Sequence, residues 1–400
     1  MALMISACSK DPESANQKPV LNVTTSADGL VVTIKGSAVD PDGTITGLNI
    51  DWGDQVTAQV AGNKSADFSL SHAYEDPGTF AIRIDAWDDT GDSTSRIVTG
   101  SPAYKETSLA GIKPGLFKTA ANEYLILTLN LHTYQEADQK MKFNMISDVI
   151  GKMDIDFIAF QECAQYKNAA ITQGIIRSNN AALVISGMIG EKYHVNYNFA
   201  WNWAHYGWDI WEEGVAVMSK YPVVQSEDRY VSSSTTTTSI TSRKVIYASC
   251  QAPGGMFNIF SAHTHWRTSL SDEEQSNQIN HIKSMVAEKE LLTPDPFSLA
   301  CGDFNGNPTS DYPWSEGYNT MMRSGEYADS FLEIYPDANQ KPAQSIYNTI
   351  GGSLPGRIDY IFLKKNPHIM VVGSQIIFTS GVVGNVSDHF GVLTKVSINP

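Results

Sequence analysis

A carboxylate and an amide stand two residues apart in Gly302-Asp303-Phe304-Asn305, where a predicted buried strand ends. The apolar residues 297–301 come directly before them, so we expect both polar side chains at the carboxyl end of that strand. By itself the motif is equally well explained as a turn, because Gly, Asp and Asn are ordinary turn formers. Polar groups of the same kinds mark other predicted strand ends, at Asn130, Glu162, His263, Asp359 and Asp388-His389. This repetition favours one shared rim, since ligand sites in layered α/β folds lie beyond strand ends.

These residue types suit the hydrolysis of a phosphate ester. Carboxylate and amide oxygens favour a hard divalent cation, Mg²⁺ in the first place and Mn²⁺ as the alternative. Such a cation neutralises charge on the reacting phosphate, and a carboxylate orients or deprotonates the attacking water. A histidine next to an aspartate supplies a hydrogen-bond donor to phosphate, and the acid sets its tautomer.

Strands and helices mix from residue 120 onward. Apolar runs predict strands over 124–130, 157–162, 214–219, 257–263 and 297–303. Apolar residues at helical spacing predict helices over 143–153 and 279–286. Because helices and strands do not alternate strictly, we expect mixed sheets rather than a purely parallel doubly wound sheet.

Residues 20–104 show short alternating runs broken by turns, which predicts a small all-β sandwich. This part resembles immunoglobulin-like domains of the polycystic-kidney-disease (PKD) type, in Asp51-Trp52-Gly53-Asp54 and in the stretch His72 to Phe80. The resemblance implies an extracellular spacer or binding module. Residues 1–19 are predicted as a lipoprotein-like N-terminus and tether, and residues 105–119, with Pro114 and Gly115, as a linker.

Residues 120–400 form the second predicted domain, and most of it resembles the endonuclease/exonuclease/phosphatase superfamily. The ordered motifs that carry this resemblance are Leu129-Asn130, Gln161-Glu162, Ser261-Ala262-His263, Gly302-Asp303-Phe304-Asn305, Arg357-Ile358-Asp359-Tyr360 and Ser387-Asp388-His389. The superfamily implies a four-layer α/β sandwich with two central mixed β-sheets and a divalent cation.

The resemblance also implies roles for the motif residues. Glu162 would be the principal metal ligand, with Asn130 and Asp388 nearby, and Asp303 and Asn305 would position the attacking water and the phosphate. His263 and His389 would stabilise the transition state or protonate the leaving oxygen, and Asp359 would orient His389. An acid supports the equivalent of His263 in some relatives, for which Glu212 and Glu213 are both candidates here.

Four residues outside these motifs are candidates for substrate binding: Trp208, Glu213, Arg243 and His265. Each has a plainer alternative. His265 can be a loop neighbour of the site, and Arg243 a solvated charge at a strand end. The tryptophan-rich segment 201–211 is either core or a pocket wall, and its interspersed polar residues favour the wall. His132 and His205 fit the rim and aromatic packing equally well, and the Ser/Thr-rich residues 232–242 are expected to form a flexible loop.

Within the superfamily, residues 203–214 and 129–136 look like a bacterial branch that includes maltose-phosphate phosphatases. Histidine rather than tyrosine at position 263 resembles the deoxyribonuclease, sphingomyelinase and inositol-phosphatase branches, and differs from the abasic-site endonucleases. His263-Thr264-His265-Trp266 departs from the sugar-phosphate branch, where leucine, glycine and tryptophan are usual after the histidine. The branch therefore favours a phosphatase without fixing its substrate.

The net charge and the cysteines limit the class of ligand and the cellular location that the sequence predicts. The net charge of -15 argues against a tight nucleic-acid binder, because phosphate-backbone binding depends on clustered Lys and Arg. Ile5-Ser6-Ala7-Cys8 looks like a bacterial lipobox, so we expect a chain that is lipid-anchored through Cys8 in the cell envelope, or secreted. The other cysteines, Cys163, Cys250 and Cys301, are expected to be buried free thiols.

The sequence thus predicts an exported Mg²⁺-dependent phosphoesterase that acts on a small phosphorylated compound, either a sugar phosphate or a lipid headgroup. A secreted metal-dependent nuclease is the first alternative. A binding protein built on an inactive catalytic scaffold is the second. Neither the substrate nor the oligomeric state follows from the sequence.

Overall fold

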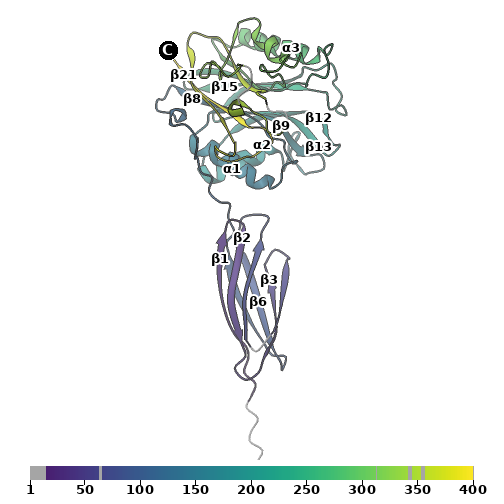
Figure 1. The fold of residues 1–400 in the computed structure, drawn as a ribbon, viewed down its shortest axis with the longest axis vertical. Coiled ribbons are helices and arrows are strands. Elements are labelled where there is room, and N and C mark those ends of the chain that lie inside the picture. Colours follow the sequence, from purple (N-terminus) through teal and green to yellow (C-terminus); the bar gives the residue numbers. More distant parts are fainter. Residues whose placement is uncertain (1–14, 63–64, 312, 341–344, 353–355, 400) are drawn as a thin grey trace, which may run out of the picture. The chain divides into compact units, whose positions relative to one another are not determined.

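The computed structural model describes residues 15–62, 65–311, 313–340, 345–352 and 356–399. The chain divides into two compact units, Met1–Lys105 and Glu106–Pro400 (Figure 1). Cys8, the predicted site of lipid attachment, lies outside the described residues. No helix in the described part of the chain is both long enough and apolar enough to cross a membrane.

The N-terminal unit is a sandwich of two antiparallel sheets, with strand orders β1-β2-β5 and β4-β3-β6-β7. Its strands are β1 (Val20–Asp28), β2 (Val31–Val39), β3 (Ile45–Asp51), β4 (Thr57–Ala61), β5 (Ser65–Ala73), β6 (Phe80–Asp88) and β7 (Ser93–Gly100). Alternate residues point inward, so Val32 and Ile34 of one sheet pack against Ile82 and Ile84 of the other, all fully buried. The predicted all-β sandwich is confirmed.

The second unit contains two six-stranded sheets, ordered β12-β13-β9-β8-β21-β20 and β14-β15-β16-β17-β19-β18. The strands of the first sheet are β8 (Glu123–Asn130), β9 (Phe157–Tyr166), β12 (Asn198–Gly207), β13 (Trp211–Ser219), β20 (Ile369–Ile377) and β21 (Gly391–Ile398). Those of the second are β14 (Val223–Tyr230), β15 (Lys244–Ala252), β16 (Gly255–His263), β17 (Phe297–Asp303), β18 (Tyr327–Asp329) and β19 (Asp359–Lys364). Both sheets contain parallel and antiparallel pairs, as predicted.

Helices cover the outer face of each sheet (Figure 1). Residues of α1 (Gln139–Met153) and α2 (Ala181–Tyr193) share one buried cluster with the first sheet. Residues of α3 (Glu274–Leu292) and α4 (Glu316–Met322) share another with the second sheet. A third apolar layer lies between the two sheets and includes Phe157, Phe257 and Leu299. The predicted four-layer α/β sandwich is therefore confirmed.

Most of the segment that the sequence predicts as a linker, residues 105–119, packs on the second unit instead. Ile112 and Leu116 are buried in the cluster beside α1 and α2. The Thr107 amide donates a hydrogen bond of 3.0 Å to Asp148 Oδ2 on α1. Prolines and glycines broke the regular pattern there, but the apolar residues between them still gain from burial.

The pairing register brings the predicted site residues together. In the parallel pair β8 and β9, Asn130 stands opposite Gln161, next to Glu162. In the second sheet, His263 stands opposite Asp303 in the parallel pair β16 and β17, and Asp303 opposite Asp359 in the antiparallel pair β17 and β19. One row across three neighbouring strands thus carries a histidine and two acids.

The two sheets are joined by buried hydrogen bonds close to this row. Gln161 Nε2 on β9 donates to Ser261 Oγ on β16 at 3.0 Å, and Ser261 Oγ donates to the Phe160 carbonyl at 2.8 Å. Both side chains are fully buried. Polar pairs in such surroundings have few alternative partners, so they fix the spacing between the sheets where the site residues emerge.

Candidate active site

A pocket of about 240 Å³ opens where these strand ends meet. Its lining combines acids, histidines, amides and apolar rings: His132, Gln135, Glu162, Gly207, Trp208, Glu213, Ile240, Arg243, His263, Trp266, Asp303, Asn305, Asp388 and His389. Both sheets contribute residues to it. Most of the residues that the sequence selected therefore share one cavity.

Asn130 links the two central carboxylates. Its amide nitrogen donates to Glu162 Oε1 at 3.0 Å and to Asp303 Oδ2 at 3.2 Å. Its amide oxygen accepts a hydrogen bond of 3.1 Å from the backbone N–H of His132. In this orientation Asn130 holds the carboxylates in place and does not turn its oxygen toward Glu162. This differs from the expectation that Asn130 is itself a metal ligand.

His389 lies between two buried acids. Its Nδ1 is 3.0 Å from Asp359 Oδ2, and its Nε2 is 3.8 Å from Asp303 Oδ2. The expected orientation of His389 by Asp359 is present in this geometry. Asp359 is fully buried and His389 is 6% exposed, so water screens this contact little.

His263 contacts the same carboxylates from the neighbouring strand. Its Nε2 is 3.6 Å from Asp303 Oδ2, and its Nδ1 is 4.0 Å from Glu162 Oε1. Both distances exceed a normal hydrogen bond, so the imidazole faces the acids without a direct bond to either. The structure thus groups His263, His389 and Asp303 around one point.

Burial and neighbouring charges together shift the pKa values of His263 and His389 in opposite directions. For His263, burial and then the nearby Arg243 charge lower the pKa well below its ordinary value. For His389, burial also disfavours the charge, but the Asp359 carboxylate outweighs it and raises the pKa to about 10. Paired groups with pKa values moved apart mark an acid and a base. At neutral pH, therefore, His389 carries a proton and His263 is neutral.

The pKa values of the two acids Glu162 and Asp303 are both raised. Burial, followed by the charge of Glu213, raises the pKa of Glu162 to about 7. Burial, followed by the charge of Asp359, raises the pKa of Asp303 to about 7 as well. Two carboxylates that share one amide donor are poorly compensated, which is the environment that a divalent cation would relieve.

Replacing Asp359 tests the charge state of His389. In the Asp359→Asn variant we expect the midpoint of the His389 titration to fall from about 10 toward the ordinary value near 6.5, because the main opposing charge is gone. The measurement is NMR titration of the imidazole Cε1–H signals. A variant in which His389 stays protonated through pH 9 would contradict this assignment.

Four residues at the pocket have left-handed backbones although none is glycine. The φ angles are 44° at Glu162, 45° at His132, 48° at Asn305 and 53° at Trp208. Such conformations cost about 1–3 kcal/mol each, and they persist where the surrounding structure imposes them. Their concentration around one cavity supports a functional role for these strand ends.

Among the described residues, two groups of three side chains can hold a metal ion, and neither contains Glu162. Asp303, Asp359 and His389 form one, and His132, Glu136 and Asp388 form the other, with ligand atoms within 4.8 Å of one another in each. Asp388, expected near Glu162 as a ligand, belongs to the second group, with Oδ1 3.6 Å from His132 Nδ1. The oxygen-rich donors of the pocket, Glu162 among them, match a hard cation.

Arg243 was expected to be a solvated charge or a phosphate contact, and the structure excludes solvation. The side chain is 4% exposed and lines the pocket. Its Nη1 lies 4.0 Å from Glu213 Oε1, its guanidinium faces the Trp266 ring at 5.6 Å, and its Nε has no hydrogen-bond partner among the described residues. A buried cation that lines a pocket and is incompletely paired is suited to an anionic ligand.

Glu212 and Glu213, the two candidates for an acid that supports His263, point in different directions. Glu213 faces the pocket, with Oε1 3.2 Å from His205 Nε2. Glu212 points to the opposite face of β13, where Arg177 and Gln165 bind it at 2.9 Å and 2.6 Å. Of the two, Glu213 therefore lies at the site, but its ion pairs are with His205 and Arg243, and the acids that face His263 are Glu162 and Asp303.

Two expectations about substrate-binding residues are wrong. His265 is not among the residues that line the pocket; its Nε2 lies 3.4 Å from Asp272, and its backbone N–H donates to Gln278. The tryptophan-rich segment forms little of the wall, because Trp201 is buried in the core and Trp203 packs against it. Trp208 alone of that segment's tryptophans lines the pocket, at 71% exposure.

Several pocket residues were not singled out from the sequence. Gln135, whose side chain accepts a hydrogen bond of 3.0 Å from Trp208 Nε1, and Trp266 follow site motifs closely, which was the available signal. Ile240 comes from the Ser/Thr-rich loop. That loop is closed by its own hydrogen bonds, such as Ser242 Oγ to the Thr236 carbonyl at 2.7 Å, rather than open and flexible as expected.

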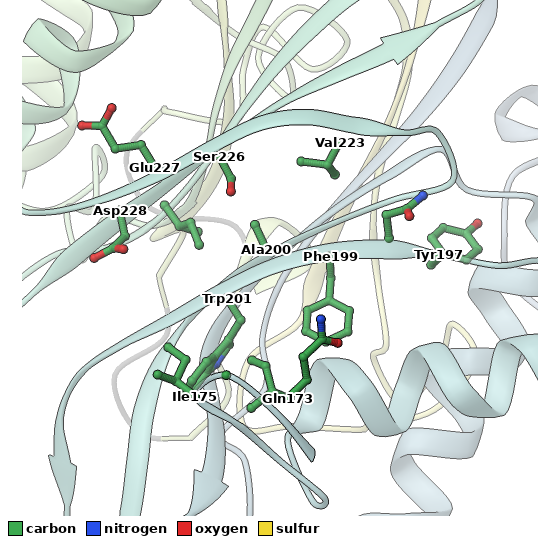
Figure 2. Close-up of a pocket in the computed structure, with 14 residues that line it drawn as sticks. Gln173, Ile175, Tyr197, Phe199, Ala200, Trp201, Val223, Ser226, Glu227 and Asp228 are labelled. Carbon is green, nitrogen blue, oxygen red and sulfur yellow. The ribbon is translucent and has the colours of Figure 1, made fainter. Parts of the chain in front are cut away.

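A second and larger pocket, of about 660 Å³, lies between the edge strands β12 and β14 (Figure 2). Its acids are already paired: Glu227 with Lys289 at 2.5 Å, and Asp228 with Lys244 at 2.7 Å. None of the predicted site residues lines it. Volume alone therefore does not identify the active site.

Comparisons with known proteins agree with this location. A model described as the endonuclease/exonuclease/phosphatase family matches residues 127–389, and a PKD-domain model matches residues 16–100. No curated protein matches the sequence. An endonuclease/exonuclease/phosphatase family protein from Leptotrichia buccalis C-1013-b is 23% identical, with a TM-score of 0.58 over 69% of this chain and 100% of its own. An endonuclease/exonuclease/phosphatase from Beutenbergia cavernae DSM 12333 is 18% identical, with a TM-score of 0.53 over 70% of this chain and 72% of its own.

Proposed function

Because the chain belongs to the endonuclease/exonuclease/phosphatase family of metal-dependent phosphoric ester hydrolases, we propose that it is an exported Mg²⁺-dependent phosphoesterase. Its substrate is a small phosphorylated compound, either a sugar phosphate or a lipid headgroup phosphoester. Water attacks phosphorus and the alcohol of the ester leaves.

One observation carries this proposal. Glu162, Asp303, His263 and the pair His389–Asp359 converge on a single pocket that also contains the buried Arg243. These groups supply what phosphate ester hydrolysis needs: a metal ligand, a water-positioning carboxylate, proton donors and a cation for the phosphate. An inactive scaffold would have no reason to retain this combination.

Glu162 would hold the cation, with Asp388 close to the mouth of the pocket. When bound, Mg²⁺ neutralises charge on the reacting phosphate. Asn130 fixes the Glu162 and Asp303 carboxylates through its two hydrogen bonds. This places the ligand and the water-positioning acid at a constant separation.

The remaining groups move or hold protons. Asp303 orients the attacking water and accepts its proton, helped by a pKa that burial raises to about 7. His389, held protonated by Asp359, donates a hydrogen bond to a phosphate oxygen or to the leaving oxygen. Neutral His263 and the Asn305 amide complete the shell around the phosphate.

Size and charge favour a small substrate over nucleic acid. Arg243 is the only Lys or Arg among the described residues that line the pocket, and the volume is about 240 Å³. Nucleic-acid enzymes present a basic stripe, which this net charge of -15 does not support. Exposed apolar side chains of Trp208, Ile240 and Trp266 surround the entrance and can contact the organic part of the ester.

Export is supported by the N-terminal unit, since a PKD domain is typical of extracellular or surface proteins. The lipobox-like Cys8 would add a lipid anchor. Globomycin treatment of expressing cells, followed by fractionation, tests this part separately, because lipoprotein processing at Cys8 would stop.

A phosphate-release screen tests the function. Purified protein is assayed with sugar phosphates, other phosphomonoesters, phosphodiesters, sphingomyelin and plasmid DNA, each with Mg²⁺ and with EDTA. We expect EDTA-sensitive hydrolysis of a small ester and little digestion of DNA. Preferential cleavage of DNA would favour the nuclease instead. Failure to bind Mg²⁺ in calorimetry would favour a binding protein.

Arg243→Met is expected to raise the KM for the phosphate ester about ten- to hundredfold, the equivalent of about 1.5–3 kcal/mol for a charged hydrogen bond. Lys244→Met is the matched control, because Lys244 is the next residue but bonds to Asp228 and Asn202 outside the pocket. Arg243→Lys should recover only part of the affinity, since Lys lacks the planar fork. Equal KM values in Arg243→Met and Lys244→Met would remove Arg243 from the substrate site.

A further inference from the structure

The N-terminal unit holds a buried carboxylate that lacks a partner. Asp40, at the end of β2, is 6% exposed. Its Oδ1 accepts a hydrogen bond of 3.2 Å from the Asp42 backbone N–H, but its Oδ2 is buried with no hydrogen-bond partner among the described residues. A buried oxygen that carries negative charge without compensation is costly.

A second carboxylate converges on the same place. A Cβ atom added at Gly43 would lie 2.6 Å from Asp40 Oδ2 and 2.5 Å from Asp89 Oδ1. The two oxygens are therefore no further apart than the sum of these distances. Bonds of about 2.3–2.6 Å from each oxygen to one Ca²⁺ ion span such a gap. A side chain at position 43 would force both carboxylates to shift.

The neighbouring acids do not complete this pair, because other donors already occupy them. Asp88 accepts hydrogen bonds from Thr90 and Asp92 through Oδ1 and from Asn16 through Oδ2. Asp42 accepts one from the Gln17 backbone N–H. The ion pairs of Asp28, Asp54 and Asp85 lie elsewhere in this unit. Asp89 Oδ2 accepts a hydrogen bond of 3.0 Å from Thr44 Oγ1, and among the described residues no Lys, Arg or His forms an ion pair with Asp40 or Asp89.

We propose that Asp40 and Asp89 bind a Ca²⁺ ion at this end of the PKD unit. Asp40 Oδ2 and Asp89 Oδ1 supply the charged ligands, and backbone carbonyls and water supply the rest. Ca²⁺ suits the place better than Mg²⁺, because it accepts irregular coordination and gives up its water more readily. The ion joins the turn after β2 to the turn after β6, and so clamps the two sheets at one end. This site is separate from the catalytic metal.

Calorimetric titration of Ca²⁺ into the EDTA-treated full chain tests this site. The titration is repeated in a Glu162→Gln background, so that binding at the catalytic pocket does not contribute. We expect one site with a Kd on the order of 10⁻⁴–10⁻³ M, the range of extracellular calcium modules. Asp40→Asn and Gly43→Ala should each weaken it at least tenfold. Asp67→Asn, an exposed acid on β5, is the matched control and should bind as before.

Thermal unfolding gives a second measurement that does not depend on the strength of the heat signal. Ca²⁺ should raise the unfolding midpoint of the wild type and of Asp67→Asn but not that of Asp40→Asn. In EDTA, Asp40→Asn should be at least as stable as the wild type, because it removes an uncompensated buried charge. Unchanged Ca²⁺ binding in both Asp40→Asn and Gly43→Ala would overturn the proposal. So would marked destabilisation of Asp40→Asn in EDTA, which would identify Asp40 as a structural residue rather than a metal ligand.

Discussion

Asp303→Asn is expected to lower the kcat for phosphate ester hydrolysis by about 10²–10⁴-fold, the usual contribution of a positioned acid or base. Asp303 Oδ2 lies within 4 Å of both catalytic imidazoles and accepts a hydrogen bond from Asn130. Asparagine keeps the size and planarity of the side chain but cannot accept a proton from water. The KM should change little, since Arg243 and the rim remain.

The loss of kcat in Asp303→Asn has to be compared with the Mg²⁺ affinity of the same variant. We assign the cation to Glu162 rather than to the group of Asp303, Asp359 and His389. Mg²⁺ affinity, measured by calorimetry, should therefore be nearly the same in Asp303→Asn as in the wild type, and a large loss of affinity would move the ion to that group. Asp295→Asn is the matched control, in an exposed turn just before β17 whose left-handed backbone asparagine readily adopts. Full activity of Asp303→Asn would refute the assigned role of this carboxylate.

The strand ends of the site were predictable because of how their strands are buried. β17 and β8 are covered on both faces, so they read as almost unbroken apolar runs, and a polar residue that ends such a run is conspicuous. Asn130, His263 and Asp303 were found in this way. Their roles came from the family resemblance, because no local pattern specifies which residue binds a metal.

The meeting of these ends was not predictable from local pattern. His263, Asp303 and Asp359 share one row only because β16, β17 and β19 pair in that order, although a long helix and several loops separate them in sequence. Pairing order depends on the packing of whole layers. Here again the ordered motifs of the family supplied what periodicity lacks.

The polarity of the tryptophan-rich segment has a simpler cause than a pocket wall. β12 is a strand, so alternate residues face opposite sides. Trp201 and Trp203 face the helices, whereas Asn202 between them bonds to Asp228 and Lys244 on the other side. Strand alternation therefore explains the mixture of apolar and polar residues without a pocket wall.

For Arg243, the structure overturns only the alternative of a solvated charge. Arginine is mostly exposed, so a strand-end arginine is expected in solvent. In this fold, Glu213 and the Trp266 ring surround its guanidinium, and both come from other strands or loops. The burial of Arg243 at the site therefore depends on tertiary contacts, which local sequence patterns do not contain.

Glu162→Gln is expected to abolish Mg²⁺-dependent activity by removing the metal itself. Even outer-shell changes at metal sites cost about 10–100-fold in affinity, so loss of the principal carboxylate should weaken Mg²⁺ binding on the order of 100-fold or more. Calorimetry and the phosphate-release assay measure the two effects. High Mg²⁺ concentrations should partly restore activity in this variant but not in Asp303→Asn, which separates metal binding from proton transfer.

The stability of the protein provides an independent check on the role of Glu162. Glu162→Gln is expected to lower the activity but not the stability in EDTA. Burial raises the pKa of Glu162 from an ordinary value near 4.5 to about 7, so between these values the folded protein binds more protons than the unfolded chain. The free energy of unfolding of the wild type in EDTA should therefore fall as pH rises from about 4.5 to 7. Glutamine carries no charge, so Glu162→Gln should lose part of this dependence and be at least as stable as the wild type at pH 8.

Mg²⁺ should stabilise the wild type at pH 8 and leave the variant nearly unchanged. Urea unfolding at pH 5 and pH 8, with EDTA and with Mg²⁺, measures all four combinations. A variant that is less stable than the wild type in EDTA at pH 8 would mean that Glu162 is a structural residue rather than a metal ligand.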